Sequence, residues 1–92
     1  MKVEIVSPEQ KLLEAEVEMI AAPGVNGEFE MLENHAPIIS LLQKGFIRIK
    51  GKNIKIDEDL EEKFIFEKDQ IKLPVNGGAL EMKNNHVIIL VE

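Results

Sequence analysis

One segment of the chain concentrates side chains of the types that bind metal ions. His35 precedes an Ala-Pro dipeptide and follows Glu28, Glu30 and Glu33 within eight residues. If this stretch forms a strand, Glu28 and Glu30 share one face of it. A lone histidine with scattered carboxylates has no established ligand spacing, so no metal site is predicted. Two alternatives remain for His35: it holds a turn by hydrogen-bonding to backbone, or it contacts a partner.

Three other positions hold residue types used in catalysis, phosphate binding or covalent carriage. Ser7 lacks the G-x-S-x-G context and an obvious base, so we expect it to close a turn after the first strand. Gly77-Gly78 lacks the Lys-Ser/Thr sequel and the helix of a phosphate loop, and instead indicates a bend or close backbone packing. Lys83 lies near a predicted turn, where small β-sandwich carrier domains attach lipoate or biotin. Asn84 breaks the Met-Lys-Met signature of biotin carriers, so a solvated lysine is favoured and the carrier function is kept as an alternative.

The elements that position these residues are predicted to be strands. Apolar and charged residues alternate over residues 47–56 and 71–75, which places them on opposite faces of a sheet. The unbroken apolar run at 87–91 is typical of a strand covered on both faces. Only Asp57–Lys63 is a candidate helix. Turn signals recur at Pro23-Gly24, Asn26-Gly27, Lys44-Gly45, Gly51-Lys52-Asn53, Asn76-Gly77-Gly78 and Asn84-Asn85. Many short strands with frequent turns predict an all-β fold, a flattened antiparallel β-sandwich of about ten short strands.

Length and composition limit the classes of function. The 92 residues predict one domain, residues 1–92, and the absence of cysteine excludes disulfides, thiolate zinc sites and a cysteine nucleophile. The net charge of −6 argues against binding to nucleic acid and against adsorption to an anionic membrane surface. No signal peptide is visible, and no apolar run approaches the roughly 20 residues that span a bilayer. We therefore expect a soluble, cytoplasmic protein that reaches a membrane only through a protein partner.

Five short motifs follow one another along the chain, at residues 6–10, 17–18, 27–37, 45–49 and 77–81. They read Val-Ser-Pro-Glu-Gln, Val-Glu, Gly-Glu with a later His-Ala-Pro, Gly-Phe-Ile-Arg-Ile, and Gly-Gly-Ala-Leu-Glu. In this order they resemble the N-terminal β-sandwich domain of the epsilon subunit of the bacterial F-type ATP synthase. Asn34 and Glu30 stand where that family usually has glycine. The segment within 52–71 is longer than is usual for the family, by about one hairpin.

The resemblance implies a non-catalytic rotor subunit of the central stalk. It would bind the gamma subunit on one side and rest on the c-ring loops at its foot, coupling ion-driven rotation to ATP synthesis within a hetero-oligomer. By position in the motifs, Glu28 would face basic c-ring loops, and Ser7, His35 and Ser40 would face gamma. No cofactor or metal is implied. The location would be peripheral, in the F1 sector at the cytoplasmic face of the inner (plasma) membrane.

The resemblance also carries an expectation about regulation. In that family a C-terminal helical hairpin inhibits rotation and, in some members, binds ATP. The sequence ends at Glu92, directly after the last predicted strand, so no such C-terminal helical domain is expected. We therefore expect this chain to couple without inhibiting, and neither to bind nor to hydrolyse ATP.

Overall fold

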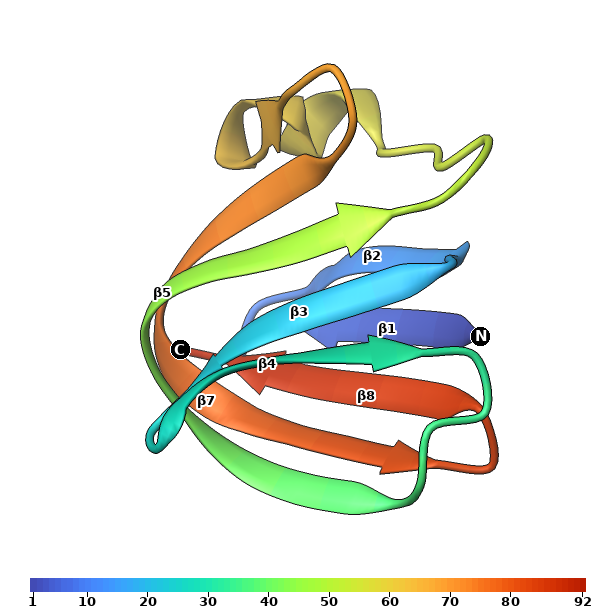
Figure 1. Ribbon diagram of the computed structural model, residues 1–92. Coiled ribbons are helices and arrows are strands. Elements are labelled where there is room, and N and C mark those ends of the chain that lie inside the picture. The colour runs from blue at the N-terminus through green and yellow to red at the C-terminus, as the bar shows by residue number, and fades with distance from the viewer.

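Eight strands and one short 3-10 helix form the structure, a computed structural model that describes residues 1–92 (Figure 1). The all-β prediction is confirmed. The strands number eight rather than about ten because two of them are 13 residues long. The elements are β1 (Lys2–Val6), β2 (Lys11–Glu16), β3 (Met19–Gly24), β4 (Gly27–Leu32), β5 (Ile38–Lys50), η1 (Glu58–Lys63), β6 (Ile65–Phe66), β7 (Ile71–Lys83) and β8 (His86–Val91).

The two long strands make a sandwich out of one continuous sheet. The strand order is β2-β1-β8-β7-β5-β3-β4, with β6 paired to β7, and only the β1–β8 pair is parallel. Strands β5 and β7 pair from Ile38↔Met82 to Ile49↔Ile71 and curve together (Figure 1). The first layer therefore contains β2, β1, β8, the second half of β7 and the first half of β5. The second layer contains the remaining halves with β6, β3 and β4.

The Gly77-Gly78 pair lies inside β7, where that strand meets β8. A Cβ atom on Gly78 would lie 2.1 Å from the carbonyl oxygen of Leu90, and the φ angle of Gly78 is +154°. Only glycine permits this approach of the two backbones, because any side chain would collide with the neighbouring strand. The prediction of a bend or close packing is confirmed.

The core is an apolar cluster of 21 buried residues contributed by both layers. Alternation along β8 shows how it is built: Val87, Ile89 and Val91 are buried, whereas Leu90 is 54% exposed. The prediction that residues 87–91 are covered on both faces is therefore wrong. Only one face of this strand packs in the core. Its other face presents apolar side chains at the surface, which the sequence pattern did not predict.

Residues 51–70 depart from the predicted alternating strand. Ile54 and Ile56 are half-buried and pack against the core from an irregular stretch, so the strand predicted there is wrong. The candidate helix is present as η1, whose cap Asp57 accepts a hydrogen bond from the Asp59 backbone N–H at 3.3 Å. Buried Leu60 anchors η1 to the core. Strand β6 then forms a small hairpin with the start of β7. None of the helical residues forms a stretch long and apolar enough to span a membrane.

Candidate functional site

The outer surface of the first layer carries exposed apolar side chains on adjacent strands. The register aligns Val6 of β1, Leu90 of β8, Ala79 of β7 and Leu41 of β5 in one row across the sheet. The neighbouring row contains Ile88 and Ile39, and Ile39 is 79% exposed. Between these two residues lies the exposed carboxylate of Glu81, whereas Val6, Ala79 and Ile88 are half-buried. Exposed aliphatic side chains gathered on one surface, with a polar group among them, are typical of protein interaction sites. We call this surface the apolar face; it comprises Val6, Ile39, Leu41, Ala79, Ile88 and Leu90.

A network of charges borders the apolar face on the β1 and β2 side. The Lys11 ammonium lies 2.6 Å from Glu14 and 3.0 Å from Glu4, and Lys2 lies 3.0 Å from Glu14. His86 Nε2 lies 2.6 Å from the second oxygen of Glu4. Hydrogen bonds from Lys11 first, and from Lys2 next, lower the pKa of Glu14 to about 2. These groups satisfy one another, so the β1 and β2 side of the border is already neutralised.

Ser7, Ser40 and His35 do not converge on one point. Ser7 directly follows Val6, and His35 lies in the loop just before β5 begins. Ser40 alternates with Ile39 and Leu41 along β5, so its half-buried side chain points to the opposite face, on the side of buried Leu80. The Ser7 hydroxyl donates to the Gln10 carbonyl at 3.0 Å and accepts from the Gln10 N–H at 3.2 Å. The prediction that Ser7 closes a turn after the first strand is confirmed, and its hydroxyl is engaged there rather than by a catalytic base.

His35 lies in a turn and contacts backbone, which is the first of the two roles predicted for it. The ring Nδ1 of His35 lies 2.7 Å from the Ala36 carbonyl oxygen, and the backbone N–H of His35 donates to the Leu32 carbonyl at 3.2 Å. The nearby carboxylates point elsewhere, because Glu28 pairs with an arginine and Glu33 with the chain's amino group. No group of three or more metal-ligating side chains is present. The exposed ring remains accessible to a partner.

Glu28 is not a free carboxylate. Arg48 of β5 donates to it twice, from Nε at 3.2 Å and from Nη2 at 2.8 Å, and donates from Nη1 to Gln70 at 3.3 Å. The hydrogen bond to Glu28 raises the pKa of Arg48 further. Glu30, the next outward residue of β4, makes no ion pair. The alternation around Arg48 predicted that its side chain points outward. Its pairing with Glu28 could not be predicted, because it depends on how β5, β3 and β4 align in the sheet.

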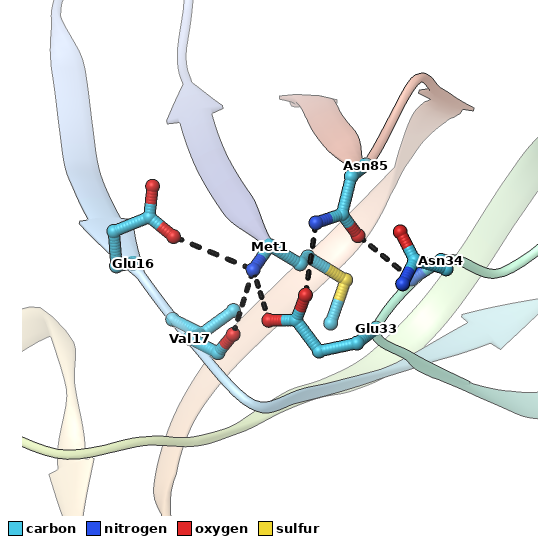
Figure 2. A network of polar contacts seen from close by, with 6 residues as sticks. All are labelled: Met1, Glu16, Val17, Glu33, Asn34 and Asn85. Atoms are coloured by element: carbon cyan, nitrogen blue, oxygen red, sulfur yellow. Dashed lines mark hydrogen bonds and ion pairs between the residues drawn. The ribbon is translucent and has the colours of Figure 1, made fainter.

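The α-ammonium group of Met1 forms a second charged centre that sequence reasoning missed (Figure 2). Met1 is buried, with 3% of its surface exposed, and its ammonium donates to Glu16 at 3.3 Å, to the Val17 carbonyl at 3.3 Å and to Glu33. The second oxygen of Glu33 accepts from the Asn85 side chain at 2.8 Å. Hydrogen bonding to Glu33 is the main cause that raises the pKa of the amine, and the amine in turn lowers the pKa of Glu33. We call the Met1 ammonium, Glu16, Glu33 and Asn85 the polar junction.

Lys83, the alternative modification site, ends strand β7 and is exposed. The two residues after it, Asn84 and Asn85, have φ angles of +52° and +61°, which is the geometry of a tight two-residue hairpin turn. The predicted Asn-Asn turn is confirmed. Asn85 belongs to the polar junction, so hydrogen bonds to Glu33 and Asn34 hold this turn against the β4–β5 loop.

These observations define a class: a small β-sandwich whose polar contacts hold its own strands together and whose outer apolar surface is suited to binding a protein. The chain belongs to the family described as ATP synthase, Delta/Epsilon chain, beta-sandwich domain, whose model matches residues 1–92. An ATP synthase epsilon chain of Polynucleobacter necessarius is 35% identical over 92 residues, covering 100% of this chain and 56% of that protein. One of Maridesulfovibrio salexigens is 38% identical over 89 residues, covering 97% and 52%.

Solved structures share the fold. A chain of the Tetrahymena thermophila mitochondrial ATP synthase, in a structure of the central stalk and c-ring, matches with a TM-score of 0.69 at 16% identity, covering 99% of this chain and 62% of that one. A chain of the Euglena gracilis mitochondrial ATP synthase matches with a TM-score of 0.72 at 18% identity, covering 97% and 48%. The present chain thus spans about half the length of the curated relatives it matches.

Proposed function

We propose that this chain acts as a non-catalytic subunit of the ATP synthase central stalk and couples the gamma subunit to the c-ring during ion-driven ATP synthesis. The apolar face carries the proposal, because exposed aliphatic side chains gathered in rows on one surface are typical of a protein-binding site. The family membership supports it, as do the epsilon-chain relatives, whose shared segment spans the whole of this chain. No cofactor is needed for such a role.

In this proposal the apolar face binds gamma, which would also contact Ser7 and His35 beside the face and Ser40 over the edge of β5. Its residues lie on four adjacent strands, which span about 15 Å at the usual strand spacing. Ile39, Leu41 and Leu90 are its most exposed members and would contribute most of the affinity. The neutralised network beside the face would form a polar border that costs little to approach.

Glu28 faces the c-ring in this proposal, on the other layer of the sandwich. A basic loop that reaches Glu28 must share it with Arg48, so the ion pair holds the carboxylate in a fixed orientation. Exposed pairs of this kind contribute only ~0–1 kcal/mol, which suits a contact that sets orientation more than affinity. The chain would be peripheral, at the cytoplasmic face of the inner (plasma) membrane, and held there by its protein partners.

Binding to purified gamma subunit of the same synthase tests the apolar face. Leu41→Glu should weaken binding at least about tenfold, because it replaces buried apolar area with a charge. Phe66→Glu is the matched control: Phe66 is 56% exposed but lies on the edge strand β6, away from the apolar face. Equal affinity of Leu41→Glu and wild type, or no gamma binding by wild type, would contradict the proposal.

Charge reversal tests the c-ring contact. Glu28→Lys should lower coupling, measured as proton or sodium pumping per ATP hydrolysed in the assembled synthase. Because the introduced lysine would also repel Arg48, the double variant Glu28→Lys/Arg48→Glu restores the internal ion pair with its sign reversed. If the double variant couples like wild type, the defect came from the broken pair and Glu28 does not contact a basic loop.

A further inference from the structure

The polar junction joins four segments that are distant in the sequence. The Met1 ammonium lies at the start of β1, Glu16 at the end of β2, Glu33 in the β4–β5 loop and Asn85 in the β7–β8 turn (Figure 2). The Asn85 carbonyl also accepts a hydrogen bond from the Lys2 N–H at 3.1 Å. The junction is therefore the point at which the β4–β5 loop is tied to the first layer.

A continuous chain of hydrogen bonds runs from the ammonium into that loop. Glu33 accepts from the ammonium with one oxygen and from Asn85 Nδ2 with the other, at 2.8 Å. The Asn85 Oδ1 then accepts from the Asn34 backbone N–H, also at 2.8 Å. His35 is the next residue, and the apolar face begins at Ile39. Contacts that hold Glu33 and Asn34 in place therefore also restrict the path of the chain into His35 and Ile39.

We propose that the polar junction is a positioning device that holds His35 and the start of β5 in the conformation that binds gamma. The inference rests on the proposed function for its partner. The ammonium has three N–H donors and three acceptors, and Met1 is only 3% exposed. Acylation or displacement of this amine would leave the surrounding acceptors without a cation, and the loop would lose its tie.

Asn85→Gly is the sharpest test of this device. Glycine adopts the φ of +61° found at Asn85 without strain, so the change removes the side chain alone and keeps the turn. Asn53→Gly is the matched control, because Asn53 has a φ of +56° in an exposed loop elsewhere. Two quantities are measured for each whole chain: the amide hydrogen-exchange rate of Asn34 and the affinity for purified gamma.

Asn85→Gly removes the hydrogen bonds of its side chain to Glu33 and from the Asn34 N–H. It should accelerate exchange at Asn34 and weaken gamma binding, each by about threefold to tenfold, the equivalent of the one hydrogen bond that the Asn34 N–H loses. Asn53→Gly should change neither. Unchanged exchange at Asn34 would overturn the proposal, and so would faster exchange with an unaltered gamma affinity. If wild type itself fails to bind gamma, the proposed function and the partner named here both fall, and the exchange rates separately decide whether the junction holds the loop.

Blocking the amine tests the other end of the device. A Gly-Ser dipeptide placed before Met1 moves the positive charge out of its covered site, and it should loosen Asn34 as Asn85→Gly does. Combining the dipeptide with Asn85→Gly should add little, because both changes break the same chain of contacts. Fully additive effects on Asn34 exchange would show that the ammonium and Asn85 act independently, against the proposal.

Discussion

Gly78→Ala should destabilise the fold far more than a typical surface substitution. The added Cβ would lie 2.1 Å from the Leu90 carbonyl oxygen, 3.1 Å from the Leu90 carbonyl carbon and 3.2 Å from the Val91 Cα. These are backbone atoms of the paired strand β8, so no side-chain rotation relieves the collision. Strands β7 and β8 must separate where they pair, which disturbs the sheet on both sides of the bend.

The magnitude follows from two contributions. A non-glycine residue at this positive φ costs ~1–3 kcal/mol, and overpacking adds ~1–3 kcal/mol or more. The expected loss is therefore about 4 kcal/mol, out of the ~5–14 kcal/mol that a chain of this size has in total. At about 4–8 °C per kcal/mol, the midpoint of thermal unfolding should fall by at least about 15 °C.

Gly27→Ala supplies the matched control for this prediction. Gly27 also has a positive φ, +122°, but a Cβ there would meet nothing within 4 Å. It should therefore lose only the backbone contribution of ~1–3 kcal/mol. Urea unfolding followed by far-ultraviolet circular dichroism measures both variants, since the chain has no Trp or Tyr for fluorescence. Equal losses for Gly78→Ala and Gly27→Ala would refute the argument that the β7–β8 contact, and not backbone strain, demands glycine.

Three further predictions concern charge, and a fourth concerns modification. The pKa of the Met1 amine is raised above its ordinary value of 8.0. The charged amine therefore stabilises the fold fully below about pH 8, and this stabilisation is lost as the pH rises through the folded pKa. Glu33→Gln should reduce the fall of the unfolding midpoint at alkaline pH, measured by melting at a series of pH values. Glu28→Gln should cost under ~1 kcal/mol in urea unfolding, since 50% of the Glu28 side chain is exposed. Arg48→Ala should cost more than Glu28→Gln, because only 26% of the Arg48 side chain is exposed and the change also removes the hydrogen bond to Gln70. The intact mass of the chain isolated from cells fed labelled biotin and lipoate should show no gain at Lys83; a gain would favour the carrier alternative.

The strand content and several of the turns could be predicted because they depend on local patterns. Period-2 alternation and the Gly and Asn turn signals act over short stretches of chain, and they correctly predicted the turn at Asn84-Asn85 and the role of Ser7. The alternation at Ile54 and Ile56 misled, because half-buried residues of an irregular stretch can produce the same pattern as a strand. The number of strands was overestimated because the turns predicted at Lys44-Gly45 and Asn76-Gly77-Gly78 are wrong: both signals lie inside the long strands β5 and β7.

The candidate site could be predicted only as residue types. Which partner each charge meets depends on register across several strands, and a shift of one residue in register reverses every face. Hence the Glu28–Arg48 pair and the apolar face built from β1, β8, β7 and β5 were invisible in the sequence. The Met1 amine was missed for a simpler reason, since pattern analysis reads side chains and this cation belongs to the backbone.

Several of the sequence motifs share one structural role, which is to form contacts between strands. The Gly-Glu and Ile-Arg-Ile motifs meet in the Glu28–Arg48 pair, and the Val17 N–H of the Val-Glu motif donates to the Met1 carbonyl at 2.8 Å. The Gly-Gly motif permits the close approach of β7 to β8. Each of these motifs therefore closes a contact between strands, and none presents a reactive group. A part that transmits torque, as proposed here, needs this distribution, because close-packed strands locked at several separate points deform little under load.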